Sequence, residues 1–156
     1  MPDALTFHMG KFPAVLPGEL RYARNHMWAR QEGAGLWRFG FTAYAVRLMQ
    51  DVYFLDWSIS AGDPVTLLQE IGHIETSKAE SDLFAPLTGT LEVFNVELLK
   101  GPEAINVDGY GGGWLFELTS ADASPLMGVE QYHQFLADNW EKTQRMIKGN
   151  INRDED

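Results

Sequence analysis

Short apolar segments recur about every ten residues between residues 21 and 118, and glycine, proline or small polar residues separate them. In residues 36–41 apolar side chains alternate with others, and in residues 51–59 aromatic and β-branched side chains predominate. These segments have the length of strands and are shorter than most helices. Because regularly spaced short strands are typical of small barrels and sandwiches, the sequence predicts a mainly β architecture for this region.

Two segments depart from this pattern and predict helices. Thr42 suits the N-cap of a short helix that would end near Met49. Residues 129–147 place apolar side chains on one helical face and polar side chains on the other. The apolar positions are Val129, Tyr132, Phe135, Leu136, Trp140 and Ile147. The predicted fold class is therefore mainly β (α+β), with short helices and a C-terminal helix.

The chain divides into three predicted parts. Residues 1–20 contain three prolines and two glycines, which predict an N-terminal arm rather than a helix. Residues 21–148 form a single predicted domain, long enough to bury roughly two-thirds of its unfolded surface. Residues 149–156 are charged and predict a frayed tail.

Composition excludes several classes of function. A net charge of −10 disfavours nucleic acid and anionic membranes as partners, since both need a basic surface. The absence of cysteine excludes disulfides, thiolate metal sites and a cysteine nucleophile, so any redox chemistry needs an added group. No apolar run is long enough to span a membrane, and the N-terminus lacks a secretion signal. The sequence predicts a cytoplasmic monomer.

The histidines predict no metal site. His8, His26, His73 and His133 include no pair at the i, i+4 spacing of a helical metal motif. The glycine-rich residues 109–113 are not followed by Lys-Ser or Lys-Thr, so they predict a turn rather than a phosphate-binding loop. No catalytic residue is predicted.

The stretch from residue 75 to residue 89 predicts two short strands joined by a polar turn. Residues 76–79 are small or polar, and an apolar Leu-Phe pair follows before Pro86 and Gly89 end the segment. Lys78 is therefore predicted at the tip of a hairpin, close in sequence to Glu75 and Glu80.

The pattern Glu-x-x-Lys-Ala-x-Ser-Asp-Leu-x-Ala-Pro-x-x-Gly in this stretch resembles the lipoylation site of the H protein of the glycine cleavage system. Further blocks resemble the same family in the same order. These are His-Met-Trp at 26–28, Gly-Phe-Thr-Ala-Tyr-Ala at 40–45, Leu-Glu-Val-Phe-Asn at 91–95 and Asn-Val-Asp-Gly-Tyr-Gly-Gly-Gly-Trp-Leu at 106–115. Together they extend over about three-quarters of the chain.

This resemblance implies the barrel-sandwich hybrid of the lipoyl/biotinyl-carrier type, in which two short-stranded sheets face each other. It also implies a non-catalytic carrier with lipoic acid attached to Lys78 and a lipoate ligase or lipoyl-synthesis enzymes as partners. The residues that the resemblance places around the arm, for recognition or docking, are Glu75, Asp82, His26, Met27, Phe41 and Leu48.

Two other carrier classes fit less well. Biotin carriers place methionine on both sides of the lysine, whereas Ser77 and Ala79 flank Lys78. Lipoyl domains of oxo-acid dehydrogenases usually show Asp-Lys-Ala, and they lack the His-x-Trp and Tyr-Gly-x-Gly-Trp blocks.

Several positions depart from glycine-cleaving H proteins. Met27 replaces an acid that could pair with a cationic aminomethyl group, and Ala43, Phe41 and Leu48 make the predicted cleft more apolar. These departures resemble the lipoate-binding proteins of sulfur oxidation. The function predicted first is therefore a carrier that acts with a heterodisulfide-reductase-like complex. The alternatives are the H protein of the glycine cleavage system, acting with glycine cleavage enzymes, and a lipoyl donor or relay protein.

Overall fold

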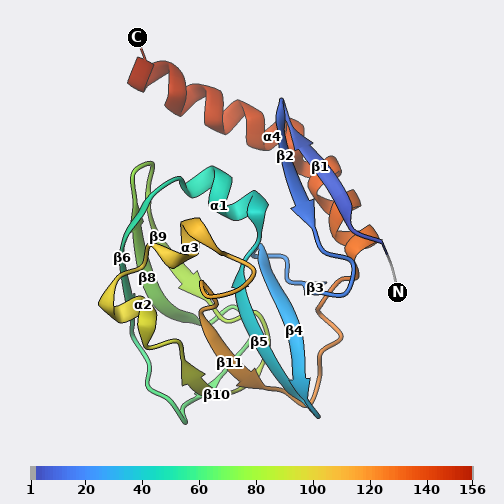
Figure 1. Ribbon diagram of the computed structural model, residues 1–156, viewed down its shortest axis with the longest axis vertical. Coiled ribbons are helices and arrows are strands. Elements are labelled where there is room, and N and C mark those ends of the chain that lie inside the picture. The colour runs from blue at the N-terminus through green and yellow to red at the C-terminus, as the bar shows by residue number, and fades with distance from the viewer. Residues whose placement is uncertain (1–2, 156) are drawn as a thin grey trace.

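The computed structural model describes the backbone of residues 3–155 and the side chains of residues 3–146 (Figure 1). The strands are β1 (Leu5–Met9), β2 (Phe12–Leu16), β3 (Arg21–Tyr22), β4 (Met27–Gly33), β5 (Leu36–Phe41), β6 (Val52–Trp57), β7 (Pro64–Val65), β8 (Glu70–Thr76), β9 (Glu80–Phe84), β10 (Gly89–Phe94) and β11 (Phe116–Thr119). The helices are α1 (Ala43–Met49), α2 (Glu97–Lys100), α3 (Ala104–Val107) and α4 (Val129–Glu155).

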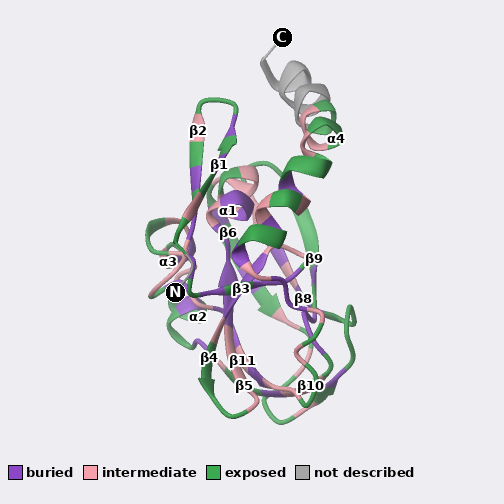
Figure 2. Ribbon diagram, turned by 90° about the vertical axis from the view of Figure 1, so that its right-hand side faces the viewer, coloured by how far each residue is buried: buried purple, intermediate pink, exposed green. Residues whose placement is uncertain are grey.

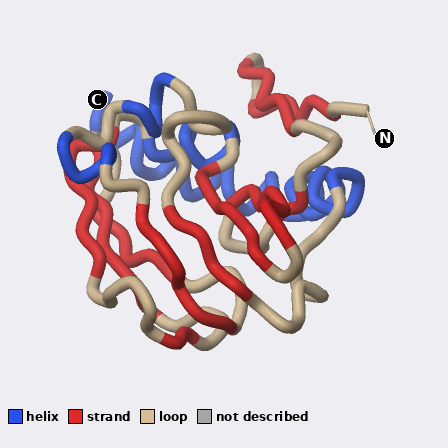
Figure 3. Tube along the Cα trace, turned by 60° about the horizontal axis from the view of Figure 1, so that its bottom comes forward, coloured by secondary structure: helices blue, strands red, loops and turns tan. Residues whose placement is uncertain are grey.

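Two antiparallel sheets enclose the main core. One has the strand order β3-β4-β5-β11-β10-β7, and the other has the order β6-β8-β9. Figure 3 shows these strands around the core, with the β1–β2 hairpin standing apart near the N-terminus. Ile71, Ile74 and Leu83 from the smaller sheet join one buried cluster with Phe39 and Leu91 from the larger sheet. The predicted arrangement of two facing, short-stranded sheets is therefore observed.

Local signals in the sequence account for several of these elements. Thr42 caps α1, as predicted, because its side-chain oxygen accepts a hydrogen bond from the backbone N–H of Ala45. The turn between β4 and β5 contains Gly35 at a φ of 70°, a conformation that favours glycine. The apolar positions within residues 65–74 favour one extended segment, but the structure breaks it. Leu68 has a φ of 67°, and β7 and β8 on either side belong to different sheets.

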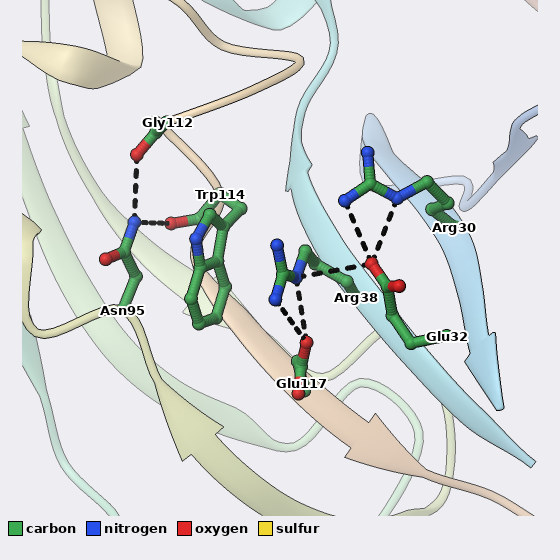
Figure 4. A network of polar contacts seen from close by, with 7 residues as sticks. All are labelled: Arg30, Glu32, Arg38, Asn95, Gly112, Trp114 and Glu117. Atoms are coloured by element: carbon green, nitrogen blue, oxygen red, sulfur yellow. Dashed lines mark hydrogen bonds and ion pairs between the residues drawn. The ribbon is translucent and has the colours of Figure 1, made fainter.

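A buried amide fixes the glycine-rich turn that follows α3. Asn95 is 5% exposed, and its side-chain NH₂ group donates to the carbonyl oxygens of Gly112 and Trp114 at 2.9 and 2.8 Å (Figure 4). The guanidinium carbon of Arg38 lies 4.1 Å from the centre of a Trp114 ring, and Arg38 also pairs with Glu117 at 2.7 Å. This turn is thereby held against β5 and β11.

The two ends of the chain build a second core that the sequence did not predict. Buried side chains alternate along the β1–β2 hairpin, so that Phe7, Met9, Ala14 and Leu16 face one side (Figure 2). They form one buried cluster with residues of α4 and with Tyr44 of α1. The prediction of an arm for residues 1–20 missed this hairpin, because its stability depends on packing against a helix more than 100 residues away.

The C-terminal helix is present and longer than predicted. It begins at Val129, as expected, and continues to Glu155, so residues 149–155 are helical where the sequence predicted a frayed tail. The predicted apolar position Ile147 lies outside the described side chains. Within the described residues, no helix combines the length and the apolar character that a membrane crossing requires.

Candidate functional site

The turn that carries Lys78 is organised by Thr76. The Thr76 hydroxyl accepts hydrogen bonds from the backbone N–H groups of Lys78 and Ala79 at 3.2 and 3.1 Å, and the Thr76 N–H donates to the Ala79 carbonyl at 2.8 Å. A hydroxyl that satisfies the N–H groups of the next residues is a common way to close a short polar turn. The side chain of Lys78 is exposed at this tip between β8 and β9, as predicted.

The same turn is tied to the connection between α1 and β6. The Ser77 N–H donates to the Asp51 carbonyl at 2.9 Å, and the Asp51 N–H donates to the Ser77 hydroxyl at 3.1 Å. In Figure 1 the tip of the β8–β9 hairpin accordingly lies beside α1. The turn that carries Lys78 is thus fixed by β8 and β9 and by the α1–β6 connection beside it.

Acidic side chains surround the turn. Glu75 and Glu80 are directly opposite each other on β8 and β9, a placement that two like charges disfavour. His73 lies between carboxylates, with Nε2 3.6 Å from Glu75 Oε1 and Nδ1 3.4 Å from Asp82 Oδ1. Glu75 and Asp82, both predicted as recognition residues, therefore share one acidic face of the hairpin.

The sequence did not reveal this histidine cluster. His73, Glu75 and Glu80 offer donor atoms that lie within 4.8 Å of one another, the spacing of a possible cation site. A search for helical spacing overlooks it, because two of the residues are two apart on β8 and the third comes from β9. Exposed carboxylates commonly gather without an ion, so this cluster alone assigns no metal.

The predicted docking residues Met27 and Phe41 are buried. They are paired across β4 and β5, and their side chains are only 1% and 4% exposed. The Asn25 side-chain NH₂ contacts the Met27 sulfur at 3.9 Å and donates to the Phe84 carbonyl at 2.9 Å. Asn25 Oδ1 is buried without a hydrogen-bond partner among the described residues. The docking role of Met27 stays a prediction, and its burial provides no open surface for an arm.

His26 lies under α4. Its Nδ1 is 2.9 Å from the Tyr132 hydroxyl, and its ring centre is 4.9 Å from that of Tyr44 and 6.0 Å from that of Phe135. Burial lowers the pKa of His26 to about 4, so the ring is neutral near pH 7. Leu48, on α1, packs against the same second core. His26 and Leu48 are therefore brought together with the chain ends rather than with Lys78.

Acid is expected to destabilise the protein through His26. The unfolded chain binds a proton on this side chain near pH 6.5 and the folded protein only near pH 4, so unfolding takes up a proton between these values. The stabilisation is complete above pH 6.5 and decreases as the pH falls towards 4, by up to about 3 kcal/mol. Urea unfolding at several pH values measures the slope of the unfolding free energy against pH. His26→Asn, which suits the φ of 65° at this position, should flatten it. Identical slopes for the two proteins would contradict the assignment.

A pocket opens beside α1. We call it the α1–α3 pocket. Its volume is about 390 Å³, and it is lined by Phe12, Phe41, Ala43, Val46, Arg47, Gln50, Asp51, Ile105, Asn106, Gly109 and Tyr110. Of the predicted docking residues, only Phe41 is among these lining residues. Asp51 connects the pocket to the Lys78 turn through its backbone hydrogen bonds with Ser77.

Comparison with known proteins identifies the family of this chain. The profile of the family described as "Glycine cleavage H-protein" matches residues 20–139. The chain belongs to this family. It is 40% identical to the glycine cleavage system H protein of Pseudoalteromonas translucida over 120 residues, which cover 75% of this chain and 92% of that relative. It is 39% identical to the same protein of Idiomarina loihiensis over 111 residues, which cover 71% and 85% of the two chains.

A solved structure supports the same assignment. The crystal structure of a glycine cleavage system H protein from Mycobacterium marinum matches with a TM-score of 0.69 and 28% identity, covering 80% of this chain and 98% of that one. The predicted barrel-sandwich fold of lipoyl carriers is thereby confirmed. Glycine cleavage H proteins are non-catalytic carriers with lipoic acid covalently attached to a lysine. The β1–β2 hairpin and the last part of α4 lie outside the family match.

Proposed function

We propose that this protein is the H-protein carrier of a glycine cleavage system and that Lys78 carries its lipoyl group. The observation that carries the proposal is the exposed Lys78 at the tip of a turn that Thr76 and Ser77 hold in place. The relatives that match over 71–75% of this chain are named glycine cleavage system H proteins. Their names support an aminomethyl group as the proposed cargo.

The sulfur-oxidation function, which the sequence predicted first, has no support among the comparisons. It depended on an apolar cleft around Met27, Phe41 and Leu48, but Met27 and Phe41 are buried in the main core and Leu48 packs in the second core. Packing in the two cores therefore explains why these positions are apolar, and a cargo other than the aminomethyl group is not needed to explain them. The glycine cleavage alternative is favoured instead. No contact among the described side chains favours a lipoyl donor or relay.

The residues around the turn fit a carrier. When bound, the lipoyl group supplies a reducible disulfide that accepts and releases the cargo. The chain itself supplies a fixed attachment point and an acidic face formed by Glu75, Glu80 and Asp82. The whole chain has a net charge of −10. The acidic face therefore suits brief docking on basic surfaces of a lipoate ligase and of the glycine cleavage enzymes. A monomer in the cytoplasm remains the predicted state.

Exchange of labelled bicarbonate into glycine tests the proposed cargo. The lipoylated protein, with glycine cleavage enzymes from the same source, is expected to support exchange, whereas the unlipoylated protein is not, because only the arm can receive the aminomethyl group. Both preparations should first be checked by intact mass. If fully lipoylated protein gave no more exchange than the unlipoylated form, while an authentic H protein worked with the same enzymes, the proposed cargo would be rejected.

A further inference from the structure

We propose that His73, Glu75 and Glu80 bind a zinc ion on the outer face of the β8–β9 hairpin. The donor atoms of these three side chains lie within 4.8 Å of one another. The carboxylates alone assign no metal, but the histidine adds a nitrogen ligand whose orientation is fixed. The site depends neither on the proposed cargo nor on lipoic acid, because all three ligands belong to the chain itself.

The pairing of β8 with β9 brings the ligands to one face. His73 is directly opposite Asp82, and Glu75 is directly opposite Glu80. Side chains two apart on a strand point to the same face, so these four residues form a compact array. Ile74, between the two ligands of β8, is buried in the main core, so the array faces the solvent.

Asp82 orients the imidazole ring of His73. Its Oδ1 lies 3.4 Å from His73 Nδ1, so Nδ1–H can donate to this carboxylate. A neutral imidazole carries hydrogen on only one nitrogen, so Nε2 then presents a lone pair. This nitrogen lies 3.6 Å from Glu75 Oε1, and a cation between the two acceptors would make their contact attractive. Histidines that bind metals commonly donate their other ring N–H to a carboxylate in this way.

The charges on the array give a second reason for a cation. Glu75 and Glu80 are directly opposite each other on neighbouring strands, where like charges destabilise the pairing. Asp56 of β6 is directly opposite His73 on its other side, and its carboxylate adds to the negative potential. A divalent ion would offset the charges of both glutamates, which lie three residues before and two residues after Lys78.

The donor types and their separation favour zinc. Zinc bonds imidazole nitrogen at about 2.0–2.1 Å and carboxylate oxygen at about 2.0–2.2 Å, so ligand atoms of a tetrahedral site are about 3.3–3.5 Å apart. The 3.6 Å between His73 Nε2 and Glu75 Oε1 is close to that separation. Glu80 is exposed, so rotation of its side chain can bring its carboxylate closer. Magnesium and calcium, by contrast, prefer sites made of oxygen ligands.

Zinc titration of the full-length, untagged protein without a lipoyl group tests the site. The chain has no cysteine, so this preparation offers no thiolate that would compete for zinc. We expect calorimetry to show one zinc ion bound per chain, with an affinity that a large excess of magnesium does not reduce at constant ionic strength. Binding that does not saturate, or that magnesium abolishes, would reduce the site to non-specific attraction and overturn the inference.

Three single variants locate the ion. His73→Gln should weaken zinc binding at least about tenfold, because the nitrogen ligand is lost, and Asp82→Ala should weaken it about tenfold through the orientation of the ring. His8→Gln is the matched control, since His8 is exposed on β1 and belongs to no group of metal donors found among the described residues. Its affinity should equal that of the wild type. Equal affinities for His73→Gln and His8→Gln would contradict the proposal.

A second measurement uses the wild-type protein and so guards against a misfolded variant. NMR spectra that correlate ring nitrogens with ring protons can follow each of the four histidines. Zinc is expected to shift the Nε2 signal of His73 until one equivalent is bound, with no comparable shift at His8 or His133. A shift centred on another histidine, or none at His73, would refute the site whatever the variants show.

Discussion

Replacement of Lys78 by arginine is expected to leave a folded protein that carries no lipoyl group and supports no exchange. The turn depends on the Thr76 hydroxyl and on backbone groups, so the substitution at an exposed tip should barely change stability. A guanidinium stays protonated, and a ligase that acylates a lysine amine has no neutral amine to use. Peptide mass spectrometry after expression with lipoate and a competent ligase measures this directly.

Lys100→Arg is the matched control for this experiment. Lys100 is also exposed, at the end of α2, where it lies 3.6 Å from Glu97. This variant is expected to acquire the lipoyl mass to the same extent as the wild type. Lipoyl mass on the Lys78→Arg variant, or its absence from a wild-type protein expressed with an active ligase, would show that the attachment residue is misassigned.

The substitution Gly89→Ala, which adds a methyl group, is expected to cause a large loss of stability. Gly89 begins β10, and a Cβ atom there would lie 1.8 Å from the Thr119 carbonyl oxygen and 2.9 Å from a Leu118 methyl carbon. Since the Thr119 oxygen belongs to the backbone, it cannot rotate away as a side chain could. The paired strands β10 and β11 would therefore have to move apart. We expect Gly89→Ala to lower the free energy of unfolding by at least about 3 kcal/mol.

Gly33→Ala provides the comparison for Gly89→Ala. Gly33 also lies in a strand, but an added Cβ would only touch the Leu36 Cβ at 3.9 Å, which is an ordinary contact. The free energy of unfolding of this variant should lie within about 1 kcal/mol of the wild-type value. Urea unfolding of the three proteins compares them directly. Equal midpoints for Gly89→Ala and Gly33→Ala would mean that the sheet relaxes around residue 89 more easily than its packing indicates.

The sequence predicted the elements that local patterns determine. Thr42 marks the start of α1 because a side chain that caps a helix acts within three residues. Lys78 was found at a hairpin tip because small polar residues between apolar pairs are a local signal as well. The family resemblance, which extends through several ordered blocks, then led to the prediction that lipoic acid is the cofactor.

Features that depend on distant parts of the chain were not predicted. The hairpin of β1 and β2 reads as an arm because Pro13 and Gly10 suggest irregular structure, and its partner α4 lies at the other end of the chain. Met27 was expected in a cleft, but a motif does not reveal that the side chain is 1% exposed. The α1–α3 pocket joins β2, α1 and α3, and no single segment carries its signal.

The joining of the two chain ends has a consequence for the order in which this protein folds during synthesis. Phe7 packs edge-on against Trp140 and His133, at ring distances of 5.5 and 5.6 Å, and His133 Nε2 lies 3.1 Å from the Thr6 carbonyl. The hairpin leaves the ribosome first but has no complete partner surface until α4 emerges. The sheets around the main core can form in the meantime, since their strands lie within residues 21–119. We therefore expect the segment that is made first to be among the last to acquire its final structure.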